Sequence, residues 1–183
     1  ASTRSRRRNS SGVNAIEMGP AGLKRLEIKI SHEELIRRVV LVYTGVPRNS
    51  GINNWEVMKA HIDGNKEVHK NFDKIAAIAN GMRTALVASD WKEAGRLLRE
   101  EWAHRRKNAP GITTPLIDRL IEVTRKAGST GAKVCGAGGG GCVTFLVEPD
   151  AKQKVAALIE KEGGQVLDVQ VAPKGVSVKV EKD

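Results

Sequence analysis

Apolar and polar residues alternate at the start of the chain in the way that is typical of β-strands. The alternation runs over residues 13–18 and resumes over residues 23–30. Between these two stretches, residues 19–22 read Gly-Pro-Ala-Gly, which is turn chemistry. The pattern therefore predicts a β-hairpin.

A short helix and a buried strand are expected next. Ser31, followed three residues later by Glu34, forms a capping box that opens a helix. The run Val-Val-Leu-Val-Tyr at residues 39–43 is apolar without interruption, as in a strand that is buried on both faces. We expect this strand to end at Thr44 and Gly45.

The middle of the chain has the period of helices. Apolar residues over 54–108 recur three and four positions apart, which predicts two or three helices, one of them capped by Asp90 with Glu93. Pro110 interrupts this pattern. Thr114 and Pro115 then have the character of an N-cap and first helical residue, and a further helix is expected to end at Gly128.

The last third predicts strands at 132–135 and 142–147, a helix at 150–162, and two strands at 166–171 and 176–180. Strands and helices thus come in blocks rather than in strict alternation. This arrangement favours an α+β fold in which helices cover one face of a largely antiparallel sheet. We expect one folded domain over residues 13–183.

Composition and charge narrow the picture. The chain of 183 residues is 40% hydrophobic and 28% charged, a balance that favours a packed core over disorder. Its net charge is +10, part of which lies in residues 1–12, a Ser/Arg/Asn-rich stretch that we expect to be a flexible tail. Such charge suits phosphorylated ligands as well as nucleic acid. With no membrane-spanning run and two cysteines, the expected location is the cytoplasm.

The most specific feature is the glycine-rich segment over residues 136–141. Glycine backbones adopt positive φ readily, so several N–H groups can turn toward one point and bind an anion. The letters also satisfy G-x-G-x-x-G, but that fingerprint needs a helix after the loop, whereas residues 142–147 have the pattern of a strand. A plain glycine connection between two strands stays open as the alternative.

A second candidate cluster follows the strand at 39–43. Arg48 could hold a phosphate or carboxylate, with Thr44 and Ser50 as hydroxyl partners, although a solvated loop arginine is the alternative. The basic residues 104–107 have the composition of a solvated helix end and could also line an anionic pocket. His61 and His69 do not have the spacing of a metal site, and none is predicted.

Three segments, in order along the chain, resemble the GHMP kinases, the superfamily of galactokinase, homoserine kinase, mevalonate kinase and phosphomevalonate kinase. Residues 131–143, GAKVCGAGGGGCV, resemble the third motif of that superfamily. The others are LVYTG at 41–45 with Arg48 and Ser50, and Glu101-Trp102 followed by APGITTP at 109–115. Together they look most like the branch that phosphorylates D-glycero-D-manno-heptose 7-phosphate.

The resemblance implies a ferredoxin-like C-terminal domain, with ATP and Mg²⁺ as cofactors and a sugar or sugar phosphate as acceptor. It places six residues beside the phosphates: Gly136, Ala137, Gly138, Gly139, Gly140 and Gly141. It places four beside the acceptor: Thr44, Gly45, Arg48 and Ser50. Glycine N–H groups and an arginine suit a reaction that depends on positioning and on charge stabilisation.

The family's ATP loop, P-x-x-x-G-L-G-S-S-A, has no counterpart in the sequence, and residues 5–10 contain no carboxylate where the catalytic aspartate would be expected. The resemblance is thus to the C-terminal half of a kinase, inactive alone, whose other half is a separate chain, truncated or lost. The rival hypothesis is a non-catalytic domain that binds nucleic acid or another anionic partner through its tail and basic surface. Counterion release would make such binding strongly salt-dependent.

Overall fold

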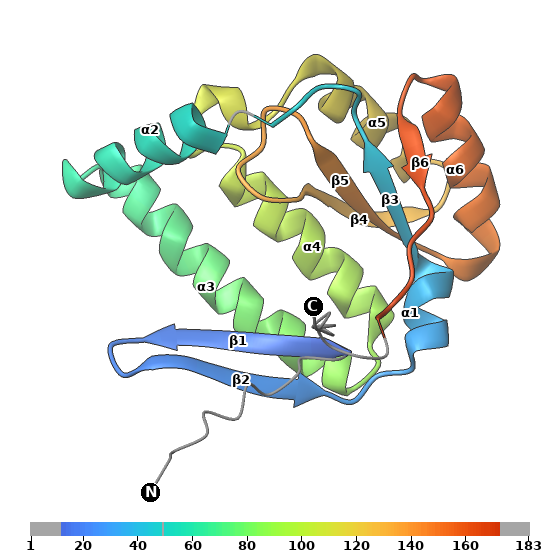
Figure 1. The fold of residues 1–183 in the computed structure, drawn as a ribbon, viewed down its shortest axis with the longest axis horizontal. Coiled ribbons are helices and arrows are strands. Elements are labelled where there is room, and N and C mark those ends of the chain that lie inside the picture. Colours follow the sequence, from blue (N-terminus) through green and yellow to red (C-terminus); the bar gives the residue numbers. More distant parts are fainter. Residues whose placement is uncertain (1–11, 49, 173–183) are drawn as a thin grey trace, which may run out of the picture.

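The computed structural model describes residues 12–48 and 50–172. The predicted hairpin is present: β1 (Val13–Gly19) pairs antiparallel with β2 (Gly22–Ile28), from Val13 opposite Ile28 to Gly19 opposite Gly22. It forms a sheet of its own, and Figure 1 shows it lying across one end of α3 (Lys66–Val87).

The short helix and the buried strand also form as predicted. Helix α1 (His32–Arg38) begins after Ser31, whose Oγ accepts the N–H of Glu34 at 3.2 Å. Strand β3 (Val39–Tyr43) follows directly, with Val40 and Val42 fully buried.

Four antiparallel strands make the main sheet, in the order β4-β5-β3-β6. Strand β4 (Ser129–Val134) and strand β5 (Cys142–Val147) flank the glycine segment, and β6 (Gln165–Leu167) pairs with the far side of β3. With helices between β3 and β4 and between β5 and β6, this is the ferredoxin-like topology that was expected. The α+β fold class is confirmed.

One face of the sheet carries the larger core. Helices α5 (Pro115–Arg125) and α6 (Lys152–Lys161) pack on this face (Figure 1), and their Leu120 and Ile159 pack with Phe145 of β5. All three side chains are fully buried. Helix α5 begins as predicted, because Thr114 Oγ1 accepts the N–H of Ile117 at 3.2 Å.

Helices cover part of the other face as well, so the expectation of helices on one face was incomplete. Helix α4 (Trp91–Arg105) places Leu97 with Leu146 of β5, and α3 packs behind it. The approach of α4 to β4 is close, since a Cβ added to Gly131 would lie 2.5 Å from the carbonyl oxygen of Gly95. Two small residues let helix and strand meet.

Several predicted boundaries shift. Helix α2 (Ser50–Ile62) begins four residues before the expected start at 54, because its first turn has no apolar period to reveal it. A 3₁₀ turn, η2 (Pro149–Ala151), precedes α6. Strand β6 is shorter than the predicted 166–171, because only residues 165–167 pair with β3. The strand predicted at 176–180 lies outside the described residues. None of the described helices is long and apolar enough to cross a membrane.

Candidate functional site

The glycine segment forms a loop between the ends of β4 and β5. The N–H of Cys135 donates to the carbonyl of Cys142 at 2.8 Å and closes the base of the loop. All of the glycines beyond it have positive φ: Gly136 at 88°, Gly138 at 81°, Gly139 at 75°, Gly140 at 141° and Gly141 at 73°. Because L side chains rarely adopt this conformation, the loop requires glycine for its path.

Two distant segments hold the loop in place. The N–H of Gly139 donates to the carbonyl of Ile112 at 2.9 Å, in the 3₁₀ turn η1 (Pro110–Ile112), and the N–H of Gly141 donates to the carbonyl of Val46 at 2.7 Å. Gly140 lies so close to the segment with Val46 and Pro47 that an added Cβ would be 2.7 Å from the carbonyl oxygen of Pro47. The interpretation as a plain connection between strands does not account for these anchors.

The anchors also decide which N–H groups are free. Gly139 and Gly141 use theirs to fix the loop, so they are not available for a ligand. Within the described part of the chain, the N–H groups of Gly136 and Ala137 have no backbone acceptor, and these two residues line a cavity. The N–H groups of Gly138 and Gly140 also lack a backbone acceptor there, but these two residues do not line the cavity, so the start of the loop is the better candidate for the anion nest.

The candidate residues after β3 meet the end of the glycine loop. Thr44 is buried, and its N–H and its hydroxyl both donate to the carbonyl of Gly141, each at 2.9 Å. Gly45 has a φ of 77° with open space beside it. Thr44 therefore fixes the geometry of the loop, whatever else it contacts.

Arg48 and Ser50 lie farther along the same segment. The guanidinium of Arg48 lies over the start of the loop, since an added Cβ at Gly136 would be 2.9 Å from its Nη1. Arg48 is exposed, and Ser50 is the first residue of α2. The structure thus brings Thr44, Gly45 and Arg48 to the glycine loop.

Asn53 of α2, which no sequence motif indicated, connects turn η1 to the glycine loop. Its buried side-chain amide donates to the carbonyl of Gly111 at 2.9 Å and to that of Ala137 at 3.3 Å. Helix α2, turn η1 and the glycine loop thus meet at one side chain. Asn53 lies in the first turn of α2, where the sequence has no apolar periodicity, so the sequence did not indicate that its side chain joins these segments.

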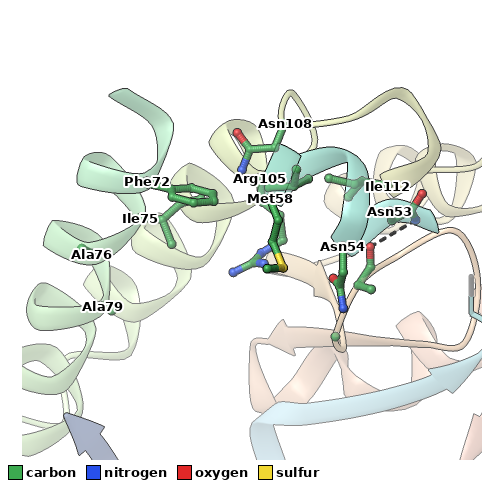
Figure 2. A pocket seen from close by; sticks show the side chains of 13 residues that line it. Asn53, Asn54, Met58, Phe72, Ile75, Ala76, Ala79, Arg105, Asn108 and Ile112 are labelled. Atoms are coloured by element: carbon green, nitrogen blue, oxygen red, sulfur yellow. Dashed lines mark hydrogen bonds between the residues drawn. The ribbon is translucent and has the colours of Figure 1, made fainter. Parts of the chain in front are cut away.

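A cavity of about 710 Å³ opens beside the loop, between α2, α3 and α4. Figure 2 shows Phe72 and Ile75 of α3 facing Met58 and Arg105 across it. Its lining is mostly apolar. Polar groups come from Asn53, Asn54, Asn108 and Arg105, and from the loop residues Gly136 and Ala137.

A charged cluster lies at the same end of α4. Glu101 is buried, and its Oε1 accepts from Arg105 Nε at 2.5 Å and from Lys133 Nζ on β4 at 2.9 Å. Only Arg105 of this cluster belongs to the basic stretch 104–107 that was considered for an anionic pocket. His104, its neighbour, contacts Asn71 instead, with Nδ1 3.0 Å from Oδ1.

The remaining titratable candidates have other surroundings. The rings of His61 and His69 stack at 4.1 Å, and the described residues contain no group of three or more His, Cys, Asp and Glu side chains that could hold a metal ion. Both cysteines are free thiols at the base of the glycine loop. Burial, together with the neighbouring Cys135 thiol, raises the pKa of Cys142, and Arg48 offsets part of this effect.

Comparison with known proteins agrees with this geometry. Residues 82–164 match the family described as GHMP kinases C terminal. A D-glycero-alpha-D-manno-heptose 7-phosphate kinase of Campylobacter jejuni is 26% identical over 146 residues, which are 78% of this chain and 42% of that protein. The chain thus spans less than half the length of this curated relative.

Solved structures share the fold. The mevalonate kinase of L. major, determined in complex with R-mevalonate, superposes with a TM-score of 0.75 at 18% identity, over 89% of this chain and 50% of that one. A D-glycero-D-manno-heptose 1-phosphate kinase from Bacteroides thetaiotaomicron gives a TM-score of 0.58 at 23% identity. The match covers 91% of this chain and 45% of that one. The resemblance carried by the glycine motif is therefore confirmed: residues 82–164, which include the glycine loop, match the C-terminal domain of the GHMP kinases, and the fold is shared with them.

Proposed function

We propose that this chain is the C-terminal part of an ATP-dependent sugar kinase. The reaction transfers the γ-phosphate of ATP to a hydroxyl of a sugar or sugar phosphate, with a heptose 7-phosphate as the acceptor. The observation that carries the proposal is the glycine loop, which is fixed by Val46, Ile112 and Asn53 and overlain by Arg48. The similarity to a heptose 7-phosphate kinase supports the choice of acceptor.

The loop has the chemistry that the phosphates of ATP require. The donors at the start of the loop are the unpaired N–H groups of Gly136 and Ala137 and the nearby guanidinium of Arg48. Pre-positioned donors of this kind stabilise the charge that spreads over a transferred phosphoryl group. We therefore assign residues 136–141 to the phosphates, with Gly138 to Gly141 shaping the loop.

Mg²⁺ bridges phosphate oxygens in phosphoryl transfer and is commonly held by one or two carboxylates. The described residues offer no cluster of three such ligands, so no residue of this chain is assigned to the metal. No residue of it is assigned as the catalytic base either. We propose that the ATP loop and the catalytic aspartate come from another part of the kinase, in the same polypeptide or in a separate chain.

Thr44, Gly45, Arg48 and Ser50 are assigned to the border of the acceptor site. Thr44 acts there through its bonds to Gly141, whereas Arg48 is exposed beside the cavity-lining Gly136 and is free to bind an anion. The apolar walls formed by α2 and α3 would exclude water from the transfer. We place the kinase in the cytoplasm, where ATP is available.

The test is transfer of ³²P from [γ-³²P]ATP to D-glycero-D-manno-heptose 7-phosphate by the native protein that contains this chain. We expect transfer, and a loss of about 10²- to 10³-fold in kcat/KM in Arg48→Ala, the scale seen for removal of one charge-stabilising donor. Arg125→Ala, at the exposed end of α5, is the matched control and should keep full activity. Absence of transfer to any sugar or sugar phosphate would overturn the proposal.

A further inference from the structure

Three cavities meet at Arg105. The cavity of about 710 Å³ and two smaller ones of about 320 Å³ each have this residue in their lining. The first and third also share Gly136, and the second and third share Lys133. These three adjoining cavities follow one another from the hairpin to the start of the glycine loop, and together we call them the groove.

Positive charge exceeds negative charge along this groove. Among the described residues, its charged lining consists of three cations and one carboxylate, namely Arg83, Arg105, Lys133 and Glu101. Arg83 is already paired with Glu17 of the hairpin. Arg105 and Lys133 share the single carboxylate of Glu101, so the pair keeps an uncompensated positive charge among largely apolar walls, where electrostatic attraction is stronger than in water.

Arg105 and Lys133 also retain unused donors. Both bonds of Arg105 to Glu101 reach the same oxygen, through Nε and Nη2, and the Lys133 ammonium uses one of its three donors there. About a third of each side chain is exposed, at 31% for Arg105 and 28% for Lys133, and both residues line the cavities. Free guanidinium and ammonium donors on one wall match a tetrahedral oxyanion.

Glu101 has the position of an orienting group. Its side chain is 91% buried, and its Oε2 has no hydrogen-bond partner in the described part of the chain. The carboxylate fixes the direction of both cations through its other oxygen. The two cations are therefore pre-positioned rather than free to move, which lowers the entropy lost when an anion binds.

This cluster is separate from the glycine loop and close to it. Arg48 lies over Gly136 on one side, whereas Arg105 and Lys133 line the cavity on which Gly136 also borders. Transfer to a phosphorylated sugar brings together the phosphate being transferred and the phosphate that the acceptor already carries. The groove provides separate cationic groups for these two.

On these grounds we propose that Arg105 and Lys133 form a second anion subsite, which binds the phosphate monoester of the acceptor. The proposal rests on the proposed kinase function and makes the acceptor a sugar monophosphate and the product a sugar bisphosphate. Glu101 is a positioning residue in this subsite. A free sugar would leave it empty.

The first experiment measures binding of inorganic phosphate to the 183-residue chain by isothermal titration calorimetry. Arg105→Met should weaken binding at least tenfold, and the cluster stays paired because Lys133 still contacts Glu101. Arg96→Met is the matched control: Arg96 lies on the same helix and forms ion pairs with Glu93 and Glu100, but it lines none of the three cavities. Equal affinity in Arg105→Met and the native chain would overturn the proposal.

A second variant guards against a loss of folding. The double substitution Glu101→Gln with Lys133→Met removes one carboxylate and one cation together, so the net charge of the cluster is unchanged and the amide oxygen introduced at position 101 can still accept from Arg105. We expect an unchanged circular dichroism spectrum and phosphate binding at least tenfold weaker. A folded double variant that binds phosphate as the native chain does would count against the subsite.

Steady-state kinetics on the native kinase then identify the source of the phosphate. Arg105→Met should raise KM for D-glycero-α-D-manno-heptose 7-phosphate at least tenfold and leave KM for ATP unchanged. A rise in KM for ATP alone would assign the cluster to the nucleotide and overturn the proposal. If native protein phosphorylates no sugar while Arg105→Met still loses phosphate binding, the kinase function and the acceptor assignment fail, and only the anion site stands.

Discussion

Gly138 lies directly against Ile112, so that a β-carbon built on Gly138 would be 2.2 Å from the Ile112 carbonyl oxygen. The same carbonyl accepts the N–H of Gly139 at 2.9 Å. A side chain at position 138 would therefore displace the acceptor that anchors the next residue. The shape of the glycine loop and the position of turn η1 depend on each other.

Gly138→Ala should destabilise the protein by about 2 to 4 kcal/mol, which combines the strain of positive φ with the steric overlap at Ile112. Gly64→Ala is the matched control, because Gly64 has a φ of 79°, close to the 81° of Gly138, with no neighbouring atom within 4 Å. It should cost about 1 kcal/mol from strain alone. Urea unfolding of both variants checks this, and equal losses would show that the contact with Ile112 carries no energy.

Local signals explain why much of the fold was predictable. The hairpin, helix α1 and helix α5 each follow from residues close in sequence: alternation around a Gly-Pro turn, the cap at Ser31 and the cap at Thr114. Strand β5 follows from the apolar run after the glycines, whereas β4 begins at Ser129, three residues before the predicted start at 132, because its first residues are small and polar. The second layer of helices against Leu146 depends on packing between distant segments, which periodicity does not report.

The candidate site divides in the same way. The glycine loop and Arg48 were found because their residue types stand in contiguous motifs. Asn53 was missed because its acceptors, Gly111 and Ala137, are 58 and 84 residues away. Lys133 contacts Glu101 over 32 residues. Only the folded chain brings such pairs together. Neither Asn53 nor Lys133 has a local sequence pattern that indicates its partner.

Asn53→Ala should destabilise the protein by about 1 to 3 kcal/mol, because it leaves the carbonyls of Gly111 and Ala137 without their donor in a largely buried place. Asn54→Ala, one residue farther along α2 and exposed, is the control and should change stability by less than about 0.5 kcal/mol. Hydrogen exchange followed by mass spectrometry should show faster exchange in residues 110–112 and 136–141 for Asn53→Ala alone. Unchanged exchange there would contradict the role given to Asn53.

Two helix glycines should respond to alanine in opposite directions. Gly95→Ala would place a Cβ 2.6 Å from Thr130 Oγ1, whereas a Cβ at Gly81 would meet only the two methyl groups of Leu97, at 3.4 and 3.5 Å. We expect Gly95→Ala to destabilise by about 1 to 3 kcal/mol through overpacking. Gly81→Ala should stabilise by up to about 1 kcal/mol through helix propensity. Thermal unfolding gives both signs, and stabilisation by Gly95→Ala would mean that α4 can move away from β4.

Cys142 should be a slow nucleophile in the folded protein. Burial raises its pKa, so less of the reactive thiolate is present near pH 8 than in the unfolded chain. In a Cys135→Ser background, which leaves Cys142 as the one cysteine of the sequence, iodoacetamide should alkylate the native protein more slowly than the urea-unfolded protein.

The same shift makes stability depend on pH. Because the folded state holds the thiol proton more tightly, the stabilising contribution of Cys142 is complete below the pKa of the unfolded thiol and is lost as pH rises through the folded value. Stability relative to Cys142→Ala should therefore fall between about pH 8 and pH 10, around the ordinary range of a cysteine thiol. Urea titrations at the two pH values measure this difference. A relative stability that rises with pH would mean that Arg48, which favours the thiolate, outweighs burial at the base of the glycine loop.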